Sequence, residues 1–276
     1  ARLNAAGMSI AESEVKARRI AQLARDLARL RGHVPAAADN PVAFWVPGRI
    51  EVLGKHTDYG GGRSLLCAVE RGICIVASAR PGHAASTSTA STVRILDARS
   101  GDVAELELSP DVESTPRHWS NYAITVARRI AMNFPGEMRG ADIAFTSDLP
   151  PAAGVSSSSA LVVAFFLALS AINDLPARQE YRDSIQTPED LAGYLGCVEN
   201  GLDFKSLHGR AGVGTFGGSE DQTAILCARP NALVQYSFCP VRFERAIAVP
   251  NDLTFVIAAS GVLAEKTGSA LELYNR

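Results

Sequence analysis

The order of apolar and polar positions along the chain predicts helices and strands in mixed sequence. Residues 9–31 place apolar side chains on one helical face, Ser9 with Glu12 forms a capping box, and Gly32 follows the end. Further helices are predicted over 118–132, 158–172, 188–200 and 264–274. Alternating or β-branched segments predict strands over 42–46, 65–79, 93–97, 103–108, 141–147 and 254–260. Without a steady strand–helix–strand rhythm, this pattern favours an α+β fold over a doubly wound sheet.

Two polar stretches interrupt the pattern and predict loops. Residues 82–92 are small and polar, and residues 201–220 contain six glycines. The second stretch is the least regular part of the chain, so we expect a flexible loop there.

Composition narrows the function classes. The chain has 276 residues and a formal net charge of −2, without a block of like charge, which argues against broad capture of nucleic acid or an anionic membrane. No apolar run reaches the roughly 20 residues that span a bilayer, and no signal peptide is recognised, so we expect a cytoplasmic protein. The five cysteines include no C-x-x-C pair, which disfavours a zinc site or a disulfide framework.

The clearest chemical signal is a run of four serines after a proline–glycine turn. Residues 147–161 read SDLPPAAGVSSSSAL, in which a strand ends, a turn follows and an apolar helix begins. A helix start offers free N–H groups and a positive dipole end to a phosphate, and Gly154 permits close approach. One serine would be an ordinary helix cap, whereas four favour a phosphate site. No Gly-Lys-Ser/Thr follows, so this is not a Walker A loop.

A second motif concentrates charged and polar side chains around glycines. Residues 47–62 read PGRIEVLGKHTDYGGG, which supplies hydrogen-bond donors and acceptors for a polyhydroxylated ligand and cations for a phosphate. A solvated turn is the plainer interpretation for any one of these residues, but not for the whole run.

Both motifs resemble those of a known family. The serine run is similar to the P-x-x-x-G-[LV]-S-S-S-[AS] motif of the GHMP kinases, and residues 47–62 resemble the galactokinase signature P-G-R-[VI]-N-L-I-G-E-H-T-D-Y-x-x-G. Further segments resemble galactokinase motifs in the same order, namely 119–122 (W-x-N-Y), 197–199, 217–222 (G-x-x-D-Q) and 274–276.

The resemblance implies the GHMP two-domain α+β fold, with the active site between the domains. Residues 1–230 would form the nucleotide-binding domain, which is ribosomal protein S5 domain 2-like. Residues 231–276 would begin a ferredoxin-like C-terminal domain, which we expect to be truncated because the family's G-x-G-x-G-G motif is absent.

The resemblance also implies ATP-dependent phosphorylation of a small sugar, expected at its anomeric hydroxyl, with Mg²⁺ and with no nucleic-acid or membrane partner, in a monomer or homodimer. Asp221 would be the base that faces the hydroxyl, with Arg49 against it. The other implied contacts are to the nucleotide (Gly154, Val155, Ser156, Ser157, Ser158, Ser159, Trp119, Tyr122), to the sugar (Lys55, His56, Asp58, Tyr274) and to Mg²⁺ (Ser158, or Ser157, with Glu199). Taken singly, many of these side chains have plainer roles, such as helix caps, aromatic core residues or a structural histidine.

Two departures leave alternatives open. Lys55 stands where galactokinases carry a glutamate that accepts a sugar hydrogen bond, which weakens the case for galactose. Another hexose, a uronic acid, a heptose or, less favoured, mevalonate would then be the acceptor, and a non-catalytic sugar sensor is a further alternative. The long interval between Glu199 and Asp221 predicts either a lid over the site or a wrong assignment of Glu199.

Overall fold

The computed structural model describes residues 2–32, 41–80, 91–115, 118–150, 154–214, 217–250 and 252–258. Within these ranges, no helix is both long enough and apolar enough to cross a membrane. The strands are β1 (Val42–Leu53), β2 (Arg63–Ala79), β3 (Thr92–Asp97), β4 (Val103–Glu107), β5 (Ala141–Ser147), β6 (Ala232–Ser237) and β7 (Arg242–Ala248). The helices are α1 (Arg2–Ala5), α2 (Ile10–Arg31), α3 (Ser120–Asn133), α4 (Ser157–Ile172), α5 (Gln179–Ser184), α6 (Pro188–Asn200) and α7 (Glu220–Cys227), with short 3₁₀ turns η2 (Asp58–Gly60) and η3 (Leu175–Ala177).

The seven strands form one sheet in the order β4-β3-β5-β2-β6-β7, with β1 paired to β2. The long strand β2 organises the sheet, because residues 73–79 pair with β5 and residues 63–66 pair with β6. All pairings are antiparallel except that of β3 with β5. The α+β prediction is therefore confirmed.

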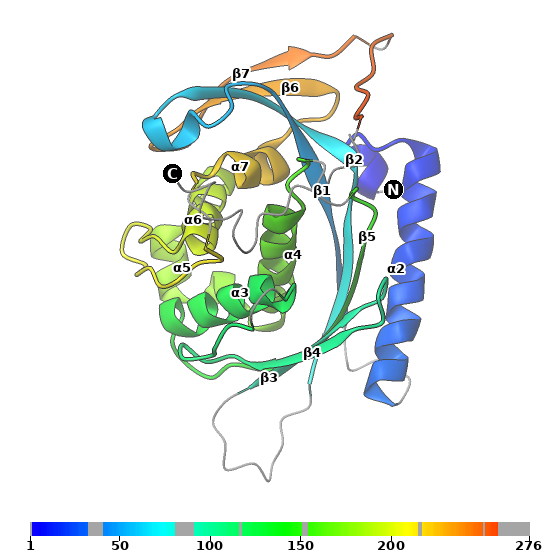
Figure 1. The fold of residues 1–276 in the computed structure, drawn as a ribbon, viewed down its shortest axis with the longest axis vertical. Helices are drawn as coiled ribbons and strands as arrows, with labels where there is room; N and C mark the ends of the chain where they lie inside the picture. Colours follow the sequence, from blue (N-terminus) through cyan, green and yellow to red (C-terminus); the bar gives the residue numbers. More distant parts are fainter. Residues whose placement is uncertain are drawn as a thin grey trace.

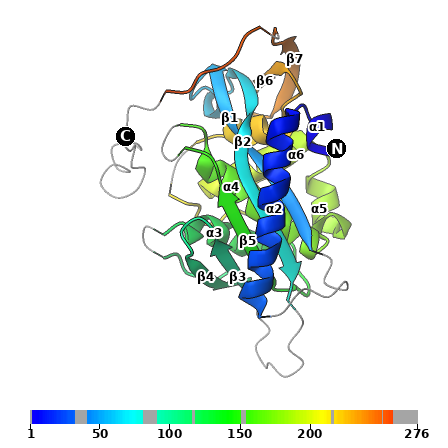
Figure 2. The same cartoon turned by 90° about the vertical axis from the view of Figure 1, so that its right-hand side faces the viewer.

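Helices cover the two faces of the sheet unequally. Helix α2 lies alone along one face, against β2 and β5, whereas α3, α4, α6 and α7 gather on the other (Figures 1 and 2). Helix α4 is apolar nearly all round and most of its side chains are buried, as expected for a helix between a sheet and other helices. Its fixed central position also holds its N-terminus in place beside β1 and α7.

The predicted N-terminal helix is confirmed, but its capping box is only half formed, because the backbone N–H of Ser9 donates to Glu70 rather than to Glu12. Ser9 accepts a hydrogen bond from the backbone of Glu12, and Gly32 ends α2 in the left-handed conformation. The strand predicted over 42–46 is longer than expected, because β1 continues through the charged motif to Leu53. Strands β6 and β7 were not predicted. They pair into the same sheet, and the division into domains at residue 230 stays a prediction.

One predicted strand is wrong. Residues 254–258 belong to no strand and are unpaired within the described ranges, and all five are exposed, so the apolar run TFVIA lacks the neighbour that would make it a strand. The predicted helix over 264–274 lies outside the described residues. The predicted loop over 82–92 also lies outside them, apart from residues 91 and 92.

Residues 201–214 of the glycine-rich loop are hydrogen-bonded to helix α3. Arg128, Arg129 and Asn133 of α3 donate side-chain hydrogen bonds to the carbonyls of Ala211, Leu202 and His208, at 3.0, 2.9 and 3.0 Å. Its glycines serve close packing, since a Cβ on Gly212 would lie 2.2 Å from the carbonyl of Glu199. These contacts pack residues 201–214 against α3, and the flexibility expected of the loop stays a prediction.

Candidate active site

Arg49 and Asp221 meet at the centre of the candidate site. Arg49 lies on β1 and Asp221 in the first turn of α7, and the guanidinium Nε and Nη2 both lie 2.7 Å from Asp221 Oδ1. The remaining nitrogen, Nη1, donates to the carbonyl of Gly154 at 2.7 Å. One arginine therefore joins the base implied by the family resemblance to the turn before the serine helix.

Asp221 is held in its ionised form. Burial favours the neutral carboxyl, but the charge of Arg49, the nearby Ser156 hydroxyl and hydrogen bonds from Arg49 and Ser159 outweigh it and hold the pKa of Asp221 below its ordinary value. The Ser159 hydroxyl donates to Asp221 Oδ2 at 3.1 Å. An ionised carboxylate in a half-buried position, 29 % exposed in its side chain, can accept a proton from a substrate hydroxyl.

The start of α4 combines strain with an unused hydroxyl. Ser156, the residue before the helix, adopts a left-handed conformation with φ 57° and ψ 48°, which is costly for a residue with a Cβ. Its Oγ is buried and, among the described residues, has no hydrogen-bond partner of normal geometry, although it lies close enough to lower the pKa of Asp221. Ser157 and Ser158 are half-buried in the first helical turn.

Glu199 lies beside the same turn of α7. Its carboxylate is buried and accepts a hydrogen bond of 2.5 Å from Gln222, the residue after Asp221. Its charge and, chiefly, burial raise the pKa of Tyr122 on α3. Despite the long interval in sequence, the structure thus brings Glu199 and Tyr122 to the candidate site.

The residues expected to contact a sugar are arranged differently. Asp58 is buried in the turn η2, and its Oδ2 accepts the backbone N–H of Glu220 at 3.0 Å. Lys55 and His56 are exposed in the turn after β1. Tyr274 lies outside the described residues. The segment that follows β1 is therefore tied to α7 through Asp58, with Lys55 and His56 free to face solvent or ligand.

Two family signatures match the parts of the chain that carry Arg49 and the serine run, whereas Asp221 lies outside both matched ranges. Residues 34–79 match the galactokinase galactose-binding signature, and residues 121–201 match the N-terminal domain of GHMP kinases. A galactokinase of Actinobacillus pleuropneumoniae is 33% identical over 132 residues, which cover 48% of this chain and 32% of that protein. A galactokinase of Haemophilus influenzae is 30% identical over 221 residues, which cover 80% of this chain and 50% of that protein. The chain thus spans about a third to a half of the length of these curated relatives.

Solved structures agree with the fold. The galactokinase of Lactococcus lactis, solved with galactose, superposes with a TM-score of 0.64 at 19% identity, covering 87% of this chain and 57% of that one. The mevalonate kinase of Methanococcus jannaschii superposes with a TM-score of 0.52 at 13% identity, covering 76% and 57%. By these matches the chain is similar to the galactokinases and to the GHMP kinases more widely.

The local structure at the start of α4 is suited to phosphate groups. Gly154 has a φ of 69°, and a Cβ built there would meet nothing within 4 Å, so its backbone borders open space. The unpartnered Ser156 hydroxyl and the N–H groups at the start of α4 are donors suited to phosphate oxygens. Within the described residues, no three His, Cys, Asp or Glu side chains form a metal site. Ser158 and Glu199 offer oxygen ligands of the kind that Mg²⁺ accepts alongside phosphate oxygens and water.

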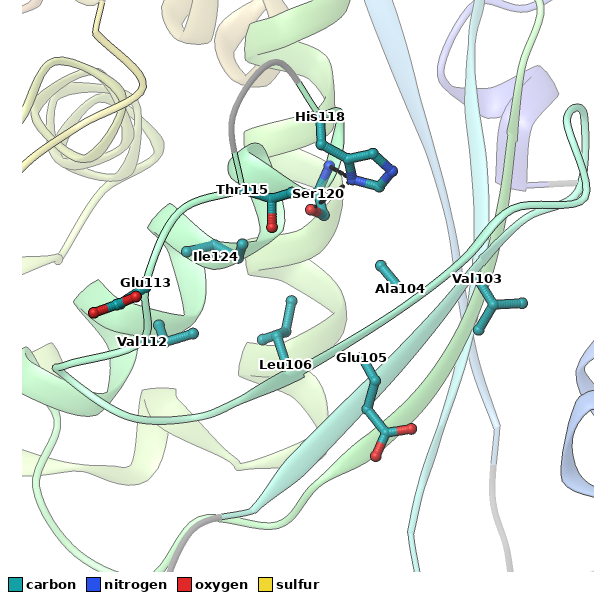
Figure 3. Close-up of a pocket in the computed structure, with 10 residues that line it drawn as sticks. All are labelled: Val103, Ala104, Glu105, Leu106, Val112, Glu113, Thr115, His118, Ser120 and Ile124. Atoms are coloured by element: carbon teal, nitrogen blue, oxygen red, sulfur yellow. Dashed lines mark hydrogen bonds between the residues drawn. The ribbon is translucent and has the colours of Figure 1, made fainter.

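The aromatic residues implied to contact the nucleotide pack against the core. Trp119 lies edge-on to Phe145, with 5.3 Å between ring centroids, and its indole nitrogen is buried without a partner among the described residues. Its sequence neighbours His118 and Ser120, but not Trp119 itself, line a cavity of about 240 Å³ together with residues that include Glu105, Val112 and Thr115 (Figure 3). His118 Nδ1 and Ser120 Oγ lie 2.7 Å apart there, and neither Arg49 nor Asp221 lines this cavity.

Sequence reasoning assigned no role to two acidic residues of this site. Glu220, directly before Asp221, is buried, and Glu51, two residues after Arg49, lies close enough to raise the pKa of Glu220. The available signals were a doubled acid at the start of a helix and a charged residue inside the apolar run Ile50 to Leu53.

Proposed function

We propose that the protein containing this chain is an ATP-dependent sugar kinase, galactokinase-like, which transfers the γ-phosphoryl group of ATP to a sugar hydroxyl, the anomeric one. The observation that supports it most directly is the convergence of Arg49, Asp221 and the turn at Gly154, joined by hydrogen bonds of 2.7 Å. This arrangement brings a base, a cation and a phosphate-binding helix start to one place, and phosphoryl transfer requires all three.

In this proposal each residue has a limited task. Asp221 accepts the proton of the acceptor hydroxyl, and Arg49 keeps Asp221 ionised and stabilises charge on the transferred group. The backbone from Gly154 to Ser159 binds the nucleotide phosphates, and Trp119 and Tyr122 border the adenine. Ser158 and Glu199 would hold Mg²⁺, which supplies charge neutralisation to the phosphates when bound.

The acceptor would be recognised by Asp58, His56 and Lys55, with Tyr274 added from outside the described residues. Because Lys55 is exposed and cationic, an acceptor with an acidic group, such as a uronic acid, is the second candidate beside galactose. A heptose is a further candidate acceptor, and the substrate panel described below includes it. The oligomeric state, monomer or homodimer, and the cytoplasmic location stay predictions.

The test measures ADP release from ATP and Mg²⁺ with a panel of hexoses, uronic acids and heptoses. We expect one sugar class to be phosphorylated, and we expect Asp221→Asn to lower the turnover number about 10²–10⁴-fold, since a general base is lost. Asp111→Asn is the matched control, because Asp111 is an exposed carboxylate 79% accessible in its side chain.

Two results would contradict the proposal. Turnover that survives in Asp221→Asn would remove the assigned base. Binding of both ATP and a sugar without any ADP release would instead favour a non-catalytic sensor.

A further inference from the structure

A buried carboxyl group that the proposed mechanism does not use lies next to Asp221. The side chain of Glu220 belongs to a residue only 5% exposed, in the first turn of α7. Its Oε2 lies 3.1 Å from the Ser64 hydroxyl of β2, and its Oε1 is buried with no hydrogen-bond donor among the described residues. An ionised carboxylate with an empty acceptor in a buried position is costly, so its protonation state needs an explanation.

The surroundings of Glu220 supply acceptors but too few hydrogens. Glu51 of β1 lies within hydrogen-bond reach of the Glu220 carboxyl, and two ionised carboxylates cannot bond each other. The Ser64 hydroxyl has one hydrogen but two possible acceptors, because its oxygen lies 3.0 Å from the carbonyl oxygen of Gly54 and 3.1 Å from Glu220 Oε2. It can therefore donate to only one of them. One additional proton on the carboxyl pair would satisfy these contacts.

The nearest cation is already engaged. All three nitrogens of Arg49 have partners in Asp221 or Gly154, so Arg49 only partly offsets the charge around Glu220. The other charged groups around this position are Asp58 from η2 and Asp221 from α7, and Glu199 of α6 is paired to Gln222, two residues further along α7. Burial first, and then the hydrogen bond and charge of Glu51, raise the pKa of Glu220 to about 9.

We propose that the buried carboxyl of Glu220 keeps a proton at neutral pH and shares it with Glu51 as a hydrogen bond, and that this pair is a positioning element that holds Arg49 and Asp221 in register. Its catalytic part rests on the kinase function proposed above. Glu51 is two residues from Arg49 on β1, and Glu220 directly precedes Asp221 on α7, so the shared proton joins the two elements that carry the proposed cation and base. Loss of that proton would leave two neighbouring negative carboxylates that repel each other, and so push apart the elements that carry Arg49 and Asp221.

The retained proton has a defined effect on stability. Below the ordinary pKa of 4.5, the folded and unfolded chains both hold the proton. Between 4.5 and about 9 the unfolded chain releases it while the folded chain keeps it, so the free energy of unfolding falls as the pH rises through this window. Glu220→Gln removes the titration, and its amide can donate to Glu51 while accepting from Ser64.

The first measurement is the melting temperature at pH 6, 7, 8 and 9, without ATP or sugar. Relative to wild type, we expect the melting temperature of E220Q to rise by roughly 5–10 °C between pH 6 and pH 9. Glu51→Gln is the second variant, because its amide also supplies the missing hydrogen, and Glu107→Gln on the exposed side of β4 is the control. Parallel curves for wild type and both site variants would overturn the shared proton.

The second measurement is the dependence of turnover on pH. Wild-type turnover should fall about tenfold between pH 8 and pH 10, whereas E220Q and E51Q should lose this alkaline limb. An identical limb in all proteins would overturn the positioning role. Because melting needs no substrate, altered melting with no sugar phosphorylated by any variant would mean that the kinase proposal fails while the shared proton stands.

Discussion

Two clusters of charged residues, each partly buried, lie on opposite faces of the sheet, and they are built differently. The outer cluster consists of Lys16, Glu12 and Arg19 of α2 with Asp148 after β5. Lys16 Nζ lies 2.5 Å from Asp148 and 3.1 Å from Glu12, and Asp148 also accepts the backbone N–H of Gly72 at 2.6 Å. Two cations face two acids there.

The inner cluster consists of Arg49, Glu51, Asp58, Glu220 and Asp221. A single arginine faces four acids, and the described residues leave Oε1 of Glu220 without a donor, as they do the nearby Ser156 Oγ. Balanced and satisfied charge contributes to folding, whereas surplus charge with unused donors and acceptors is costly unless a proton or a ligand completes it. The difference separates a structural ion cluster from a candidate site.

Among changes in the inner cluster, Arg49→Gln should lower the turnover number most. Without the cation, turnover should fall about 10²–10³-fold, because charge stabilisation at the transferred group is lost. Arg49 now lowers the pKa of Asp221, so its removal should raise that pKa and move the acidic limb of the turnover profile to higher pH. ADP release measured from pH 5 to pH 9 checks both effects.

Arg49→Lys separates charge from geometry in the same assay. Lysine keeps the cation, but one nitrogen cannot bridge Asp221 and Gly154 as the guanidinium does. Compared with Arg49→Gln, we expect Arg49→Lys to return the acidic limb of the pH profile close to its wild-type position, while the turnover number recovers less. If Arg49→Gln were as active as the wild type, Arg49 would have a structural role only, like the residues of the outer cluster.

Lys16→Met should have the next largest effect, and on stability alone. Lys16 is fully buried, and its loss leaves Asp148 buried beside only one cation, Arg19, at a cost of about 3 kcal/mol in the free energy of unfolding. Urea denaturation followed by circular dichroism measures this cost. The turnover of the protein that remains folded should stay unchanged.

The double variant Lys16→Met/Asp148→Asn tests the cause. An asparagine oxygen can still accept the N–H of Gly72, and the uncompensated charge is gone, so part of the stability should return. A double variant as unstable as the sum of both single variants would show that packing, rather than charge, dominates the outer cluster.

Local sequence signals were sufficient for much of the fold. The capping box at Ser9 and the glycine at position 32 predicted the bounds of α2, because both act within one helical turn. The apolar run of 254–258 misled because strand formation depends on a partner elsewhere in the chain. Strands β6 and β7 were missed for the same reason, since β7 exposes most of its side chains and lacks alternation.

The residues of the candidate site also divide into those that local sequence motifs reveal and those that only contacts between distant residues reveal. Arg49, Asp221 and the serine run were found through motifs, which carry family resemblance rather than geometry. Glu51 and Glu220 received no role because their meaning comes from a contact between residues far apart in the chain, and from burial that no local pattern reports. The six glycines of 201–220 suggested flexibility, whereas contacts with Arg128 and Arg129 turn the described part into a packed segment.

Ser159→Ala should give the smallest effect, and it asks how finely the inner cluster is tuned. Its hydroxyl donates to Asp221 Oδ2 at 3.1 Å, and a hydrogen bond to a charged acceptor contributes about 1.5–3 kcal/mol. Because Arg49 still neutralises Asp221, we expect only about a tenfold fall in turnover and a modest rise in the pKa of Asp221. Ser170→Ala, another buried serine of α4 but three turns away, is the control for helix packing. If both variants lost turnover equally, the Ser159 hydroxyl would act through helix packing, and the inner cluster would depend on Arg49 alone.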